Sequence, residues 1–86
     1  MNTSTKPKVL IEKLEFGKGI EVYLTSGDRL VIPYDYTGRL ANASKKALAN
    51  YRLIGGGRGV HFEELDEDIS LEGILRYKLS HELRAS

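Results

Sequence analysis

The fold is decided by residues 20–32, which read IEVYLTSGDRLVI. Apolar and more polar residues alternate over positions 20–24, as in a strand that buries one face. Residues 25–28, TSGD, are typical of a turn, and the alternation resumes at Leu30 and Ile32. The stretch therefore predicts two antiparallel strands joined by a tight turn.

The preceding residues extend this pattern toward the N-terminus. Leu10, Leu14 and Phe16 share one parity, which Glu12 interrupts, and Gly17 and Gly19 then supply turn residues. Residues 9–32 thus predict a three-stranded antiparallel meander. Residues 1–8 are polar and offer nothing to bury, so we expect a disordered tail before a single domain over residues 9–86.

The C-terminal half predicts helices and one more strand. Ser44 is a suitable N-cap for a short helix over residues 45–51, which the glycine run 55–59 would end. Residues 60–62 are a candidate fourth strand, and residues 63–68 a solvated acidic loop. Residues 35–42 have no clear period and suggest a loop.

A second helix is predicted after Ser70, its N-cap. Its apolar positions trace one stripe, made of Leu71, Ile74, Leu75, Leu79 and Leu83. The predicted fold is therefore α+β: a three-stranded antiparallel meander, a short helix, a short fourth strand and a C-terminal helix packed on the sheet.

Composition limits the chemistry. The chain has 86 residues, so we expect one small domain. It has no cysteine, which excludes disulfides, thiolate metal sites and cysteine nucleophiles. No apolar stretch approaches the roughly 20 residues of a membrane span, and no signal peptide is visible at the N-terminus. We expect a cytoplasmic protein.

Three features invite a catalytic or metal-binding interpretation. The run Gly55–Gly59 could cradle a phosphate, but the P-loop pattern is absent and a structural turn explains it. The acidic run Glu63–Asp68 lacks the glycine of a calcium loop, and carboxylates before a helix suit its dipole. His61 has no recognisable set of zinc ligands around it. We therefore expect no catalytic, cofactor or metal site, and no enzymatic activity.

Charge is divided along the chain. Residues 1–61 carry ten basic and five acidic side chains, a net +5, and residues 62–86 carry three and seven, a net −4. One hypothesis is that the basic face between Arg39 and Arg58, with tyrosines nearby, binds nucleic acid. The alternative is that this face meets the acidic run of the same chain or of another protein.

Three further stretches carry a resemblance to a known family. They are residues 38–44, GRLANAS, residues 49–62, ANYRLIGGGRGVHF, and residues 65–75, LDEDISLEGIL. Together with residues 22–29, they resemble the bacterial domain-of-unknown-function family numbered 2442. The family usually has Trp where Tyr51 and Phe62 stand, and the chain after Tyr77 extends past the usual end of the family.

The resemblance implies a small α+β fold with an antiparallel sheet and no established activity. Members are often encoded beside a domain-of-unknown-function 4160 protein, an arrangement similar to a toxin–antitoxin pair. Because the sequence offers no catalytic set, we expect a non-enzymatic protein-interaction module, and the resemblance implies an antitoxin-like partner of the neighbouring gene's product. Nucleic-acid binding or regulation through the basic face is the alternative.

The candidate interaction residues are of two kinds. The charged ones can form a structural ion-pair network, in which Asp66 and Asp68 are available to Arg39 and Arg52, or can meet a partner. For the leucines of the last helix there are two alternatives: they fold back on the sheet, or they form an interface with a partner or with a second copy in a homodimer. The full set is Arg39, Arg52, Arg58, His61, Asp66, Asp68, Leu79 and Leu83.

Overall fold

The computed structural model describes residues 8–84, with the side chains of residues 8–81. The tail predicted for residues 1–8 therefore falls almost entirely outside the described residues. The first three strands are β1 (Ile11–Phe16), β2 (Ile20–Leu24) and β3 (Arg29–Ile32), which pair antiparallel in the order β1-β2-β3. The predicted meander is confirmed.

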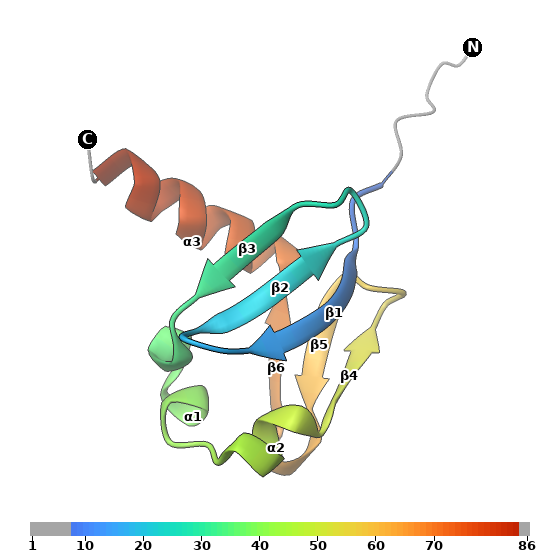
Figure 1. Ribbon diagram of the computed structural model, residues 1–86, viewed down its shortest axis with the longest axis vertical. Coiled ribbons are helices and arrows are strands. Elements are labelled where there is room, and N and C mark those ends of the chain that lie inside the picture. Colours follow the sequence, from blue (N-terminus) through green and yellow to red (C-terminus); the bar gives the residue numbers. More distant parts are fainter. Residues whose placement is uncertain (1–7, 85–86) are drawn as a thin grey trace.

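A second three-stranded antiparallel sheet follows in the chain. It consists of β4 (Tyr51–Ile54), β5 (Gly59–Phe62) and β6 (Glu67–Ser70), in that order. Between the two sheets in sequence lie a 3₁₀ turn η1 (Tyr34–Tyr36) and the short helices α1 (Gly38–Ala41) and α2 (Lys45–Ala49). The last helix, α3 (Leu71–Arg84), leaves directly from β6 (Figure 1). The α+β class is confirmed, with two sheets in place of one.

Three local predictions were wrong. The middle helix ends at Ala49, and Tyr51 begins β4, so Gly55–Gly59 does not cap a helix but turns β4 into β5. The acidic run is not a plain loop: it forms a 3₁₀ turn η2 (Glu63–Leu65) and then β6. Residues 35–42 hold most of η1 and all of α1.

The parity break at Glu12 has a structural cause. The register of β1 against β2 shifts between Ile11 and Lys13, which marks a β-bulge. The bulge brings both Ile11 and Leu14 to the inner face, where both are buried. The first apolar residue of the core is therefore Ile11, and Leu10 is only half-buried.

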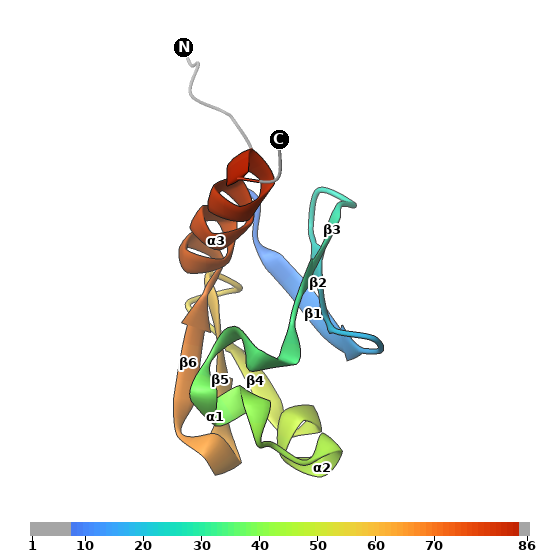
Figure 2. The ribbon, with the colours of Figure 1, turned by 90° about the vertical axis from the view of Figure 1, so that its left-hand side faces the viewer.

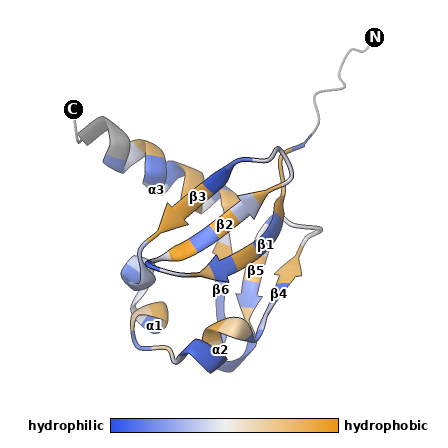
Figure 3. Ribbon diagram, in the orientation of Figure 1, coloured by the Kyte–Doolittle hydropathy of each residue, from blue (hydrophilic) through white to orange (hydrophobic). Residues whose placement is uncertain are grey.

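The core lies between the two sheets, which face each other in Figure 2. Alternating inward residues of both sheets belong to one cluster, and Figure 3 shows the same hydropathy alternation along the strands. The central members are Ile20, Val22 and Ile32 from the first sheet and Val60, Phe62 and Ile69 from the second. Leu40 of α1 and Leu48 of α2 extend this cluster.

Two polar contacts join the sheets at the outer edge of β1. The amide of Ile11 donates to the carbonyl of Gly57, with N and O 2.7 Å apart. The amide of Leu14 donates to the hydroxyl of Tyr51 at 2.9 Å, and the Tyr51 ring packs between Phe16 and Phe62. Backbone groups that a sheet edge would leave unpaired are thus satisfied by the other sheet.

Helix α3 starts as predicted. The hydroxyl of Ser70 accepts a hydrogen bond from the amide of Gly73 at 2.9 Å, as an N-cap does. Leu71 and Ile74 are buried in the core cluster, which confirms that the start of the helix packs on the sheets. Farther along, Tyr77 packs edge-on against Tyr36 of η1, with 5.1 Å between ring centroids.

Candidate functional site

The outer face of the second sheet carries a row of charged side chains. Register places Arg52 of β4, His61 of β5 and Asp68 of β6 side by side. Nδ1 of His61 donates to Oδ1 of Asp68 at 2.5 Å, and Nε2 of His61 lies 3.5 Å from Oε1 of Glu63. Nε of Arg52 lies 3.4 Å from the same Glu63 oxygen. The four side chains form one network across three strands.

This network connects the three strands of the second sheet through their side chains. His61 points outward, opposite to Val60 and Phe62 as the alternation predicts, yet its side chain is only 16% exposed because its neighbours cover it. Interacting polar side-chain pairs across neighbouring strands stabilise a sheet. No group of three or more potential ligand side chains within the described residues could hold a metal ion.

The predicted partners in this network were wrong. Arg39 does not pair with a carboxylate: its Nη1 donates to the backbone carbonyls of Leu65 and Asp66 at 3.1 and 3.0 Å. Arg52 pairs with Glu63, and Asp68 with His61. Arg39 therefore fastens α1 to the bend before β6, where Asp66 takes a left-handed φ of 49°.

The three arginines of this stretch, Arg39, Arg52 and Arg58, do not gather around exposed tyrosines. Arg39 and Arg52 are already engaged, and Arg58 lies in the β4–β5 turn, at the opposite end of the second sheet from α2. Tyr51 is held between the sheets, and the hydroxyl of Tyr34 donates to the carbonyl of Gly17 at 2.6 Å. The geometry of a stacking platform for nucleic acid is not formed by these residues.

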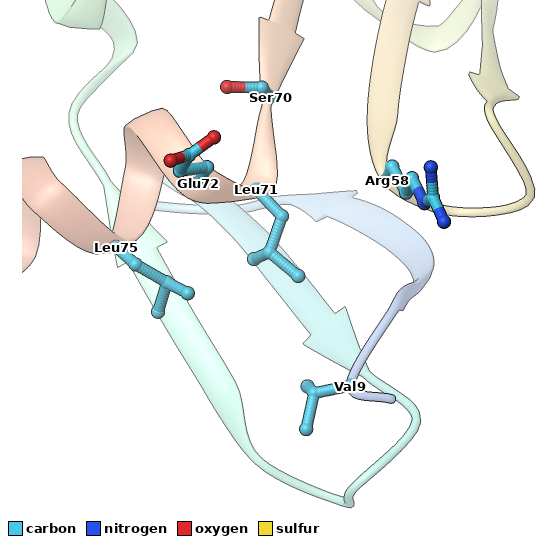
Figure 4. A pocket seen from close by; sticks show the side chains of 6 residues that line it. All are labelled: Val9, Arg58, Ser70, Leu71, Glu72 and Leu75. Carbon is cyan, nitrogen blue, oxygen red and sulfur yellow. The ribbon is translucent and has the colours of Figure 1, made fainter. Parts of the chain in front are cut away.

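A hollow of about 350 Å³ opens where α3 leaves β6 (Figure 4). Figure 4 shows Leu71 and Leu75 pointing to the same side, toward Val9, while Arg58 lies across the hollow from Leu75. Ser70 and Glu72 complete its lining. Its floor is therefore apolar and its rim polar, which is the usual composition of a binding site.

Exposed apolar side chains continue from this hollow along α3. Leu75 and Val9 are 41% and 45% exposed, and Leu79, one turn beyond Leu75, is 62% exposed. Of the two alternatives for the leucines of the last helix, Leu79 follows the one in which the side chain is left uncovered. The side chain of Leu83 lies outside the described residues. The last turns of α3 extend away from the sheets in Figures 1 and 2.

With this geometry in place, comparison with known proteins assigns the chain to a family. A family model described as "Protein of unknown function (DUF2442)" matches residues 11–80. The chain belongs to the DUF2442 family. The match reaches residue 80, so the expectation that the chain leaves the family after Tyr77 was wrong, and Leu79 lies within the family's span.

One solved structure shares the DUF2442 fold of this chain. It is a protein of unknown function from Rhodospirillum rubrum, with a TM-score of 0.72 and 27% sequence identity over 81% of this chain and 88% of that one. No curated protein matches the sequence. No helix among the described residues of this DUF2442 protein has the length and hydropathy to cross a membrane.

Part of this site was missed from the sequence. Val9, Ser70 and Glu72 line the hollow but were not among the candidate residues, and Leu75 was assigned to the apolar stripe alone. The available signal was position: Leu75 and Leu79 are four residues apart on one helix face, whereas Leu71 and Ile74 already fill the core-facing side. Val9 and Leu75 lie close together only because of how the two sheets pack, which the spacing of residues on one helix does not specify.

Proposed function

We propose that this protein is a non-enzymatic protein-interaction module whose partner docks on α3 and the adjoining hollow. The observation that carries the proposal is the 62% exposure of Leu79 next to the 41% exposure of Leu75 on the same helix face. Contiguous apolar side chains with a polar rim are typical of protein-binding surfaces. A partner that buried both leucines would gain from each a part of the roughly 1.5–3 kcal/mol that full burial of a leucine contributes, since both are already partly covered.

The charged rim favours a defined orientation of the partner. Arg76 pairs with Glu72 one turn away at 2.9 Å, and Nζ of Lys78 donates to the carbonyl of Val31 at 3.1 Å. The charged ends of both side chains are thus already paired before a partner docks. A polar rim that is already ordered loses less side-chain entropy when a partner docks.

The partner we propose is the product of the neighbouring gene, with this protein as its antitoxin-like counterpart. Support comes from the family resemblance, because such genes are often adjacent to one for a domain-of-unknown-function 4160 protein. A partner of different sequence is favoured over a second copy by the form of the surface. Leu79 lies one helical turn beyond Leu75, and Leu75 lines a hollow that a separate segment can enter.

Co-expression with the neighbouring gene tests the proposal. The tagged wild-type chain is expected to co-purify with the product, whereas Leu79→Asp lowers the yield of complex at least about tenfold, because burying a charge opposes docking. Ser80→Asp, which adds the same charge to the exposed neighbouring position, leaves the yield unchanged. Thermal unfolding of both variants establishes that they fold.

Two outcomes would contradict the proposal. One is equal capture of the product by the wild type and Leu79→Asp. The other is a concentration-dependent dimer in sedimentation that Leu79→Asp dissociates, since the surface would then belong to a homodimer.

A further inference from the structure

A second hollow lies on the outer face of the second sheet. Register places Ile54, Gly59 and Ser70 side by side across β4, β5 and β6. Gly59 has no side chain, so the outer face is indented between its two neighbours. The resulting hollow has a volume of about 330 Å³, close to that of the hollow beside α3. Each volume is at the lower end of the roughly 300–1,000 Å³ of ligand pockets.

The two hollows are neighbours. Arg58 and Ser70 line both of them, so the hollows lie on either side of these two residues. Leu75 lies in the first hollow and Ile54 in the second. We call the two hollows, with the two residues between them, the trough; it extends from α3, past Arg58, to the outer face of the sheet.

Arg58 is the one cation among the described residues that line this trough. The two carboxylates that line it are engaged: Glu72 pairs with Arg76 at 2.9 Å, and Asp68 accepts from His61 at 2.5 Å. The Arg58 guanidinium makes no hydrogen bond or ion pair with any described residue. Arg58 is therefore the lining side chain to which an anionic group of a partner can bind.

The position of Arg58 is fixed by its backbone and stem. Its carbonyl accepts from the amide of Leu71 at 2.8 Å, which ties the turn to the start of α3. Its aliphatic stem covers Gly55, where an added methyl group would lie 3.3–3.8 Å from the Cβ, Cγ and Cδ atoms of Arg58. The backbone and the stem of Arg58 thus lie at the junction of the two apolar hollows.

We propose that the trough binds an extended, acidic segment of the protein partner. In this segment an Asp or Glu side chain pairs with Arg58, and apolar side chains on either side of it occupy the two hollows. Guanidinium groups bind carboxylates through two parallel hydrogen bonds, which gives such a pair directional specificity. The inference rests on the proposed function, because it names the chemistry of the segment that docks beside α3.

Selection of peptides tests the proposal. Random linear 12-residue peptides displayed on phage are selected on the immobilised full chain, and the enriched peptides are made synthetically for affinity measurement. We expect sequences in which Asp or Glu is flanked by apolar residues. Arg58→Glu should weaken their binding about tenfold or more, since a charge-assisted hydrogen bond is lost and a repulsion is introduced.

Two substitutions serve as controls. Lys18→Glu makes the same change of charge in the exposed β1–β2 turn, outside the trough, and should leave affinity unchanged. Arg58→Lys keeps the charge but not the two-pronged geometry, and should have an intermediate effect. The Leu71–Arg58 hydrogen bond uses only the backbone carbonyl of Arg58, so these variants are expected to fold, which thermal unfolding checks.

Three outcomes would overturn the inference: no enriched peptide, enriched peptides without acidic residues, or peptides whose affinity Arg58→Glu leaves unchanged. Co-purification with the neighbouring gene's product separates the two proposals. If Leu79→Asp abolishes the complex and Arg58→Glu does not weaken it, the proposed function stands and the acidic segment is wrong. If neither substitution affects the complex, both proposals fail.

Discussion

Gly57 lies where the two sheets meet and no side chain fits. Its φ is 108°, and a Cβ atom there would come within 2.7 Å of the Ile11 carbonyl oxygen. Gly56, its neighbour, also has a left-handed φ, 67°, but open space around it. Comparing an alanine substitution at Gly57 with one at Gly56 therefore distinguishes the destabilisation caused by backbone strain from that caused by the close contact between the sheets.

Gly57→Ala is expected to lower the free energy of unfolding by about 3 kcal/mol or more, because it adds a backbone clash to conformational strain. Gly56→Ala meets only the strain and should cost about 1–2 kcal/mol. Urea denaturation of both variants measures the difference. Equal losses would show that the contact between Gly57 and Ile11 contributes nothing.

Tyr51 allows a second test at the level of single residues. Tyr51→Phe keeps the ring between Phe16 and Phe62 but leaves the Leu14 amide without its partner. We expect a loss of about 1–2 kcal/mol in the free energy of unfolding. Tyr23→Phe, whose hydroxyl contacts Glu21 on the outer face of the first sheet, should stay within about 0.5 kcal/mol of the wild type. Similar losses in both would contradict the bridging role of Tyr51.

Among the elements, η1 and α3 are coupled through two aromatic rings. Burial of Tyr36, and secondarily its neighbour Tyr77, raise the pKa of the Tyr36 phenol above its ordinary value of 10.0. The folded state therefore holds this proton more tightly than the unfolded state. The resulting stabilisation is fully present below pH 10 and is lost as the pH rises through the folded-state pKa.

Tyr36→Phe removes this ionisation. The variant should lose less stability than the wild type when the pH is raised from neutral to above 10. Urea denaturation across this pH range measures the two slopes. Identical alkaline losses would show that the phenol of Tyr36 titrates alike in the folded and unfolded chain.

The elements also show where sequence patterns suffice. Residues 20–24 alternate cleanly and pair as predicted, because one face lies on the core. Strand β6 reads EDIS, a composition poor in strand-forming residues, and it is a strand because β5 offers it a pairing edge. Strand β4, YRLI, follows an alanine-rich helix. The helix predicted for residues 45–51 runs into Tyr51, so the sequence pattern does not reveal where the strand begins. Its signal was the glycine-rich link between two short apolar runs, which is typical of a hairpin.

The candidate site shows the same division. Helical spacing placed Leu79 on the same apolar stripe as Leu71 and Ile74, but left open whether the sheet covers it, and the structure leaves it 62% exposed. The charged network could be expected as a group, but its pairing depends on the register of β4, β5 and β6, which single residues do not specify. The hollow beside Arg58 is lined by Val9, which precedes β1, by Arg58 of the β4–β5 turn and by residues of α3. Its formation therefore depends on how the two sheets pack against each other.

The whole molecule has one core shared by two sheets, so neither sheet buries its inner face alone. We expect the sheets to unfold together. Native-state hydrogen exchange should then give the amides of Val22 and Val60, both fully buried, the same free energy of opening, equal to that of global unfolding. A clearly lower value for either amide would mean that one sheet opens independently.

Each sheet is built from three strands that are consecutive in the chain, and this order matters during synthesis. Hairpins with short links close at little entropic cost, so each meander can form as soon as its residues have left the ribosome. The first meander is complete at Ile32, while Val60 and Phe62, which cover it, are still to be translated. For that interval its apolar inner face is open to solvent, and this is the stage at which the nascent chain is most exposed to aggregation and to chaperones.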